Sequence, residues 1–174
     1  MSERVRQQIA ASIDVKRQML ENPASIVILT ALAETCPAVF RGGNRVLPEG
    51  NSGNAADSRY IAAAFVSHFE FHRPGLRSIA LTTDTSVLTA HGNDCDFDRL
   101  FLRQLEVNGW RGDVFIGTEM PGNSKNILLA IANCSRLGII SVGLSGSGGA
   151  AQSTCDYMFK CHRRILSGFR NRIS

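Results

Sequence analysis

Short apolar runs alternate with helical patterns over most of this 174-residue chain, and this alternation limits the possible folds more than any other feature. Apolar strands separated by helices predict an α/β fold, in which helices cover both faces of a doubly wound, mainly parallel sheet. We expect one domain over residues 1–174. Its five predicted strands are residues 46–47, 78–82, 113–117, 139–144 and 157–159.

Two further helices are predicted before the alternating part. Residues 2–21 have the pattern of an amphipathic helix, and residues 24–40 that of a second helix, which Pro37 should kink or end early. The apolar residues near one face of the first helix are Val5, Ile9, Ile13 and Leu20. Because this stripe has no partner within the alternating part, we expect residues 1–41 to take part in subunit assembly.

Composition excludes several classes of protein. The hydrophobic content of 44% and charged content of 20% are those of an ordinary globular protein. We find no run of about 18 apolar residues and no signal peptide, so we expect a cytoplasmic protein without a membrane partner. The five cysteines form no C-x-x-C pair, which favours reduced thiols.

The net charge of +4 is concentrated at the end of the sequence, in residues 161–174. A solvated basic tail is the simpler interpretation, and contact with nucleic acid or an acidic surface is the alternative. Phe169 is a single aromatic residue among the basic ones and does not form a series on which bases would stack, so nucleic acid is not an expected partner.

Residues 50–57, Gly-Asn-Ser-Gly-Asn-Ala-Ala-Asp, lie between the first predicted strand of the alternating part and a helix. A glycine-bearing turn at a helix N-terminus can present backbone N–H groups and the positive end of the helix dipole to an anion. This pattern predicts a phosphate or phosphosugar site. A turn that carries Gly and Asn for backbone reasons alone is the competing interpretation.

Other loops favour the phosphate interpretation. Residues 83–86 and 118–124 also follow predicted strands, and residues 145–149 are rich in Gly and Ser. Ligands of such sheets bind outside the carboxyl ends of the strands, where these loops would gather.

Several motifs then resemble those of the phosphoheptose isomerase family, which is built on the sugar isomerase (SIS) domain. The resemblance covers residues 5–160. Its motifs lie at residues 50–57, 73–75, 80–86, 92–94, 112–117, 122–126 and 144–146. It implies conversion of sedoheptulose 7-phosphate to glycero-manno-heptose 7-phosphate, for lipopolysaccharide or capsule synthesis, by cytoplasmic homotetramers with active sites between subunits. The sugar phosphate positions that it implies are Asn51, Ser52, Gly53, Asn54, Asp94, Glu119 and Ser124.

The chain departs from the family at reactive positions. The family sequence G-N-G-G-S-A-A-D-A-Q-H-I-A-G-E-F places a His at Tyr60 and, at Ala64, the Glu that the resemblance identifies as the base. Alanine cannot accept a proton. The same two positions hold zinc in some relatives, so we expect neither metal nor cofactor here. The family's C-terminal R-I-Q-E-x-H motif, which supplies a catalytic His, has no match in the sequence.

The expected phosphate cradle is also changed. Where the family has S-T-S-G-N-S, this chain has Glu119, Met120 and Pro121 before Gly122-Asn123-Ser124. Pro121 removes a backbone donor and an ionised Glu119 would repel phosphate, so we expect weak sugar phosphate binding. Asp94 has an alternative role as a helix cap or turn residue.

Three interpretations follow from these departures. The chain is an isomerase with replaced groups, a non-catalytic SIS binding or regulatory module, or a decayed product that lost its C-terminal helix. The resemblance extends to a relative of the second kind, the tetrameric initiator-associating protein, which binds the bacterial replication initiator and also lacks the Glu. We expect a homo-oligomer, a tetramer first and a dimer second, with little or no isomerase activity.

Overall fold

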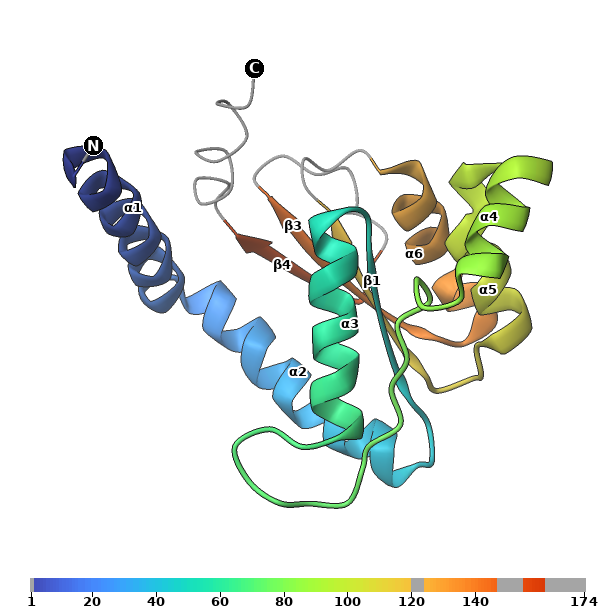
Figure 1. The fold of residues 1–174 in the computed structure, drawn as a ribbon. Helices are drawn as coiled ribbons and strands as arrows, with labels where there is room; N and C mark the ends of the chain where they lie inside the picture. The colour runs from blue at the N-terminus through green and yellow to red at the C-terminus, as the bar shows by residue number, and fades with distance from the viewer. Residues whose placement is uncertain (1, 120–123, 147–154, 162–174) are drawn as a thin grey trace.

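The computed structural model describes residues 2–119, 124–146 and 155–161. Four parallel strands form one sheet in the order β1-β2-β3-β4, with helices on both of its faces (Figure 1). The strands are β1 Val46–Gly50, β2 Val114–Glu119, β3 Ile140–Gly146 and β4 Tyr157–Cys161. The helices are α1 Ser2–Glu21, α2 Pro23–Arg41, α3 Gly53–Val66, α4 Thr85–Asp94, η1 Phe97–Arg99, α5 Leu100–Asn108 and α6 Lys125–Leu137.

The parallel α/β architecture is confirmed, but the expected strand at residues 78–82 is wrong for the described chain. This segment makes only an isolated parallel bridge, between Ser78 and Val46 of β1. Val46 donates to the Arg77 carbonyl and accepts from the Ile79 N–H. The next residue of β1 that faces this segment is Pro48, which has no N–H to donate, so the ladder stops after one bridge.

The two faces of the sheet are covered by different helices. Leu47 and Phe115 lie in one buried cluster with residues of α5 and α6, including Phe101 and Ile131. Their neighbours Val46 and Val114 point to the opposite face. There they pack with Val142 of β3, with Val39 and Phe40 of α2, and with Phe65 of α3. The sheet is therefore packed on both faces. This packing fixes β1, β2 and β3 next to one another, so that their carboxyl ends lie at the same edge of the sheet.

Helix α6 packs very closely on β2. A Cβ at Gly117 would come within 2.8 Å of Ile127 and within 3.1 Å of Ile131, so only glycine allows this approach. Gly138 ends α6 in the left-handed conformation, with φ of 69°. The close approach places the N-terminus of α6 beside the carboxyl end of β2.

The two N-terminal helices lie largely outside these clusters. Helix α1 extends away from the sheet, as Figure 1 shows, and the predicted apolar stripe is exposed, for example at Ile9 and Leu20. Helix α2 begins at the N-cap Asn22, passes through Pro37 without ending, and contacts β4. Their use in assembly remains a prediction.

One finding differs from the expectation of no membrane-spanning segment. Helix α2 is long and apolar enough, by length and composition alone, to cross a membrane. The count of continuous apolar residues missed it because Thr30, Glu34 and Thr35 interrupt the run. Most of this helix is not buried in the described structure, which agrees equally well with a surface that another subunit covers.

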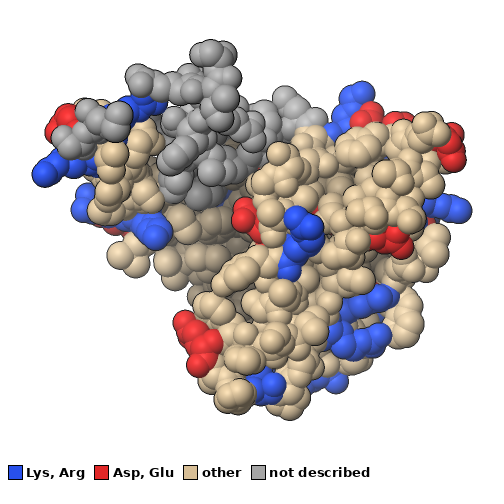
Figure 2. Space-filling model, in the orientation of Figure 1, with Lys and Arg blue, Asp and Glu red and all other residues tan. Residues whose placement is uncertain are grey.

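The charged residues do not gather into one stripe on the face shown in Figure 2. Lys and Arg side chains form small separate groups there, with acidic groups between them. This surface has no continuous basic track of the kind that follows a nucleic acid backbone. The basic residues 162–174 lie outside the described residues.

Candidate functional site

The turn after β1 is built for a sharp reversal into α3. A Cβ at Gly50 would come within 2.4 Å of the Asn54 Cβ, so this strand end requires glycine. Ser52, the N-cap of α3, has φ of 55°, a conformation that non-glycine residues rarely adopt. Such strain is typical of functional turns, where the surrounding structure maintains it.

Two asparagines tie this turn to α6. Asn51 and Asn126 exchange amide hydrogen bonds of 2.9 and 3.0 Å, and Asn126 is buried. Asn54 donates a longer bond, 3.4 Å, to the Thr118 carbonyl at the end of β2. These bonds hold the expected residues Asn51–Asn54 against the ends of β2 and α6. The sequence placed Asn126 in a motif but gave no signal of this pairing.

Two helix N-termini therefore meet at this edge of the sheet. Ser52 precedes α3 and Ser124 precedes α6, and neither side chain caps its own helix. The first-turn N–H groups of Asn54, Ala55 and Ile127 already donate to acceptors within the chain. The two serine hydroxyl groups and the remaining first-turn N–H groups are suited to bind oxygen atoms of a ligand. The helix dipoles add a positive potential that favours an anion.

Two buried carboxyl groups oppose that potential. Glu49 at the end of β1 and Glu119 at the end of β2 are essentially unexposed. By strand alternation they lie on the same face as Leu47 and Phe115. The sequence predicts Glu119 as a site residue, but it does not predict the burial of Glu49, because the apolar strand pattern ends at Leu47.

Burial dominates the ionisation of both groups. It raises the pKa of Glu49 to about 7, against the N–H groups of Gly50, Leu81 and Thr82, which lower it. Only Gly50 donates a well-aligned bond, 2.8 Å to Oε1, and Oε2 has no partner. Burial also raises the pKa of Glu119, against the Ser124 N–H. Neither Glu119 oxygen has a hydrogen bond of normal geometry.

Tyr60 and Ala64, the positions at which the resemblance implies a metal ligand and a base, lie further along α3 in a mainly apolar environment. Tyr60 and Ala64 line a cavity of about 410 Å³ together with Phe69, Phe71 and other apolar residues. Arg73 donates to the Ala64 carbonyl at 2.8 Å and so holds the next loop against this end of the helix. Ala64 supplies no donor atom, so these two positions do not fit zinc. Among the described residues, no three His, Cys, Asp or Glu side chains gather as a metal site.

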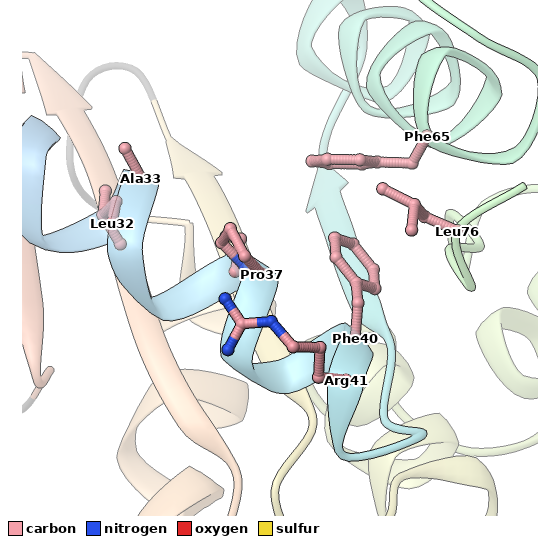
Figure 3. A pocket seen from close by; sticks show the side chains of 8 residues that line it. Leu32, Ala33, Pro37, Phe40, Arg41, Phe65 and Leu76 are labelled. Carbon is pink, nitrogen blue, oxygen red and sulfur yellow. The ribbon is translucent and has the colours of Figure 1, made fainter. Parts of the chain in front are cut away.

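A larger cavity of about 640 Å³ lies beside this one, between α2 and α3 (Figure 3). Leu32 and Phe40 of α2 line it together with Phe65 of α3 and Leu76 of the following loop, and the rings of Phe40 and Phe65 are in contact, with centroids 5.2 Å apart. Its lining is almost wholly apolar, with Arg41 the one charged member. It lacks the polar groups that would orient a sugar phosphate and has the character of a protein contact surface.

The remaining predicted site residues are only partly brought together. Asp94 ends α4, accepts a bond from Asn93 and lines a groove between α4 and α5. No described hydrogen bond or ion pair joins it to Asn51–Asn54. The nearby Asp98 pairs with Lys125 at 3.1 Å, which links this region to the start of α6. Pro121 and residues 147–149 lie outside the described residues.

Known proteins resemble this chain in sequence and in structure. The pattern of one family, described as the SIS domain, matches residues 9–146. A phosphoheptose isomerase from Aneurinibacillus thermoaerophilus is 47% identical over 92% of this chain and 81% of its own length. Phosphoheptose isomerase 2 from Campylobacter jejuni is 51% identical over 87% of this chain and 76% of its own length.

Among solved structures, a phosphoheptose isomerase from Francisella tularensis matches with a TM-score of 0.85 and 28% identity, covering 94% of this chain and 87% of that one. A second, from Neisseria gonorrhoeae, matches with a TM-score of 0.82 and 29% identity, covering 93% and 86% of the two chains.

Proposed function

Because the chain belongs to the SIS-domain family of phosphoheptose isomerases, we propose that it binds a sugar phosphate but does not isomerise it at a normal enzymatic rate. The binding site is the carboxyl edge of the sheet, where the turn after β1 meets the start of α6. The ligand's oxygen atoms bind the Ser52 and Ser124 hydroxyls and the adjacent backbone N–H groups.

The observation that carries the proposal is the environment of Ala64. Aldose–ketose isomerisation needs a base that takes a proton from carbon, and general bases contribute about 10²–10⁴-fold to a rate. Ala64 has no such group, and its described neighbours in the 410 Å³ cavity are mainly aromatic and aliphatic. Neither a carboxylate nor an imidazole lines that cavity, and its polar side-chain groups are the Tyr60 hydroxyl and the Arg73 guanidinium.

The phosphate end of the site is weakened rather than abolished. Two helix N-termini still favour an anion, but Glu119 places a buried carboxyl group beside Ser124. An ionised Glu119 opposes phosphate by on the order of 1–3 kcal/mol. Replacing residues 119–121 by the family's Ser-Thr-Ser is expected to tighten phosphosugar binding, and unchanged affinity would remove Glu119 and Pro121 from this account.

The test separates binding from catalysis in one sample. Sedoheptulose 7-phosphate is added to the purified protein, its stabilising effect is measured by thermal shift, and its conversion is followed by NMR. The proposal predicts a dose-dependent thermal shift with almost no conversion. The Campylobacter jejuni relative, assayed in parallel, serves as the positive control. Absence of a shift at millimolar ligand, or rapid conversion, contradicts the proposal.

A second candidate function is a non-catalytic module that acts through protein contacts. The apolar stripe of α1 and the 640 Å³ cavity beside α2 favour it, because both expose apolar surface that a monomer leaves uncovered. Assembly of copies of this chain, as a tetramer or else a dimer, is the simplest use of that surface. Sugar phosphate binding and assembly through protein contacts are then compatible functions of one protein. The bound sugar phosphate would act as a regulatory signal and would not be converted.

A further inference from the structure

The loop that follows α3 carries two histidines placed symmetrically about a tight turn. Residues 68–72 are His-Phe-Glu-Phe-His, and the loop extends past the end of α3 in Figure 1. Phe69 and Phe71 form an isolated antiparallel bridge, and the Phe71 N–H donates to the Phe69 carbonyl at 2.8 Å. Glu70 lies between them with φ of 63°, the left-handed conformation that so tight a reversal requires.

This bridge makes His68 and His72 direct neighbours across the turn. In an antiparallel pair, the residues on either side of a bridge lie opposite each other, with Cβ atoms about 4.5–5.5 Å apart. The two imidazole rings are accordingly close, with centroids 4.8 Å apart and planes at 33°. Because side chains alternate between faces, the histidines lie on the face opposite to Phe69 and Phe71, which line the 410 Å³ cavity.

Both ends of the loop are fixed to α3. His68 follows directly after the C-cap of this helix. Arg73, the residue after His72, donates from its guanidinium to the carbonyls of Ala64 and Phe65, at 2.8 Å each. The two imidazoles are therefore held close together before any ligand binds, which lowers the entropy cost of binding one between them.

The histidine pair is accessible, and its surroundings suit a cation. Both side chains are exposed, and no described hydrogen bond or ion pair engages either ring. The negative end of the α3 dipole lies at the start of this loop and favours positive charge. Glu70 at the tip adds a carboxylate that none of the described ion pairs uses. The charge of Arg73 is bound at the α3 carbonyls.

The spacing of the rings fits two ligands of one metal ion. Imidazole nitrogens lie about 2.0–2.1 Å from zinc, so two of them on one ion bring their ring centroids to about 5 Å apart. We propose that His68 and His72 together bind a divalent transition metal ion of the zinc, nickel and copper class, which imidazole prefers. No third His, Cys, Asp or Glu side chain joins the pair in the described chain, so water fills the remaining positions.

This site is not the one that the resemblance implies. Zinc-binding relatives use the positions of Tyr60 and Ala64, which lie within α3. His68 and His72 lie beyond the end of that helix, and the sequence shows them only as two ends of a palindrome about Glu70.

The test titrates the full chain with Zn²⁺ at about pH 7.5, where imidazole is mainly neutral, and follows the histidine ring signals by NMR. The signals of His68 and His72 should shift together, whereas that of His91, in the groove between α4 and α5, should not. Mg²⁺ is the matched ion, and it should shift none of them because it prefers oxygen ligands. Equal shifts with Mg²⁺, or unshifted His68 and His72 signals with Zn²⁺, would overturn the proposal.

Variants locate the metal ion. His68→Gln and His72→Gln each remove one ligand from an exposed position, so Zn²⁺ affinity, measured by calorimetry, should fall at least about tenfold in each. The control His91→Gln should leave affinity within about twofold. Cys95→Ser removes an exposed thiol, the competing zinc ligand, and should also leave it within about twofold. Affinity that falls in Cys95→Ser but is unchanged in both loop variants would place the ion at the thiol and overturn the proposal.

Discussion

At the scale of single residues, the carboxyl edge is defined by groups that a phosphate site would not be expected to bury. Glu119 stands where the resemblance implies a serine hydroxyl, and both Glu49 and Glu119 are buried at the carboxyl ends of their strands. Their raised pKa values follow from loss of water rather than from neighbouring acids. The site therefore becomes more negative, and less favourable to phosphate, as these groups ionise.

Glu49 has a direct consequence for stability. Its pKa rises from 4.5 to about 7 in the folded protein, so the native state holds a proton that the unfolded chain releases between those pH values. The contribution of this group is thus greatest below pH 4.5 and declines as pH rises through 7. Glu49→Gln is expected to raise the free energy of unfolding at pH 8 by on the order of 2–3 kcal/mol.

The measurement is urea unfolding of both proteins at several pH values. The advantage of Glu49→Gln over the wild type should shrink as pH falls from 8 towards 4.5. The control Glu34→Gln alters an exposed position of α2 and should show little dependence. A constant advantage across that range would exclude Glu49 as the titrating group.

Glu119 makes a separate prediction about the ligand. Glu119→Ser restores a hydroxyl beside Ser124 and removes the buried carboxyl group, so inorganic phosphate should bind about tenfold more tightly at pH 8. The gain should be smaller at pH 5, where the wild-type carboxyl group is more often protonated. Calorimetric titration checks this, with Glu34→Ser as control, and no gain at pH 8 would count against a role for Glu119.

At the scale of elements, most of the sheet could be predicted from apolar patterning, and the exception has a local cause. The expected strands at 113–117, 139–144 and 157–159 correspond to β2, β3 and β4. The segment at 78–82 has the same apolar pattern, but it can form a strand only if a neighbouring strand offers hydrogen bonds to it. The sequence of the segment does not show whether such a neighbour exists. Pro48 denies it a ladder bond, and the Glu49 side chain lies near the N–H groups of Leu81 and Thr82.

The candidate site was less predictable for a similar reason. The Gly50 turn and the start of α6 were recognised because they carry family motifs in a strand-to-helix context. The amide pair Asn51–Asn126 joins residues 75 positions apart, and periodicity has no information about such a contact. The buried state of Glu49 is also a tertiary effect, since propensity places a glutamate on the surface.

This explanation of the missing strand can be tested by Pro48→Val. The new N–H at position 48 should donate to the Ile79 carbonyl and extend the bridge that Val46 begins. Hydrogen exchange by NMR should then show a protected amide at residue 48, while protection elsewhere in β1 is unchanged. An amide at position 48 that exchanges as fast as an exposed loop would refute this role of Pro48.

At the scale of the whole molecule, exposed apolar surface is concentrated in the N-terminal helices and the adjoining cavities. The stripe of α1 and the 640 Å³ cavity beside α2 are both left uncovered in a single copy. We therefore expect an oligomer, and light scattering at micromolar concentration should give a tetramer, or failing that a dimer, of the 18.9 kDa chain.

One substitution pair tests which surface is used. Ile13→Lys places a charge in the apolar stripe and should shift the protein to smaller species. Gln7→Lys adds the same charge on another face of α1 and should leave the assembly intact. A stable wild-type monomer, or equal effects of the two variants, would show that the stripe has another purpose.

The central claim is that this member of the family binds without isomerising, and the turnover number for sedoheptulose 7-phosphate tests it most directly. We predict almost no turnover by the wild type, and none restored by Ala64→Glu alone, because Glu119 still impairs the phosphate end of the site. A wild-type kcat within about tenfold of a typical enzyme, roughly 10 s⁻¹, would contradict the account.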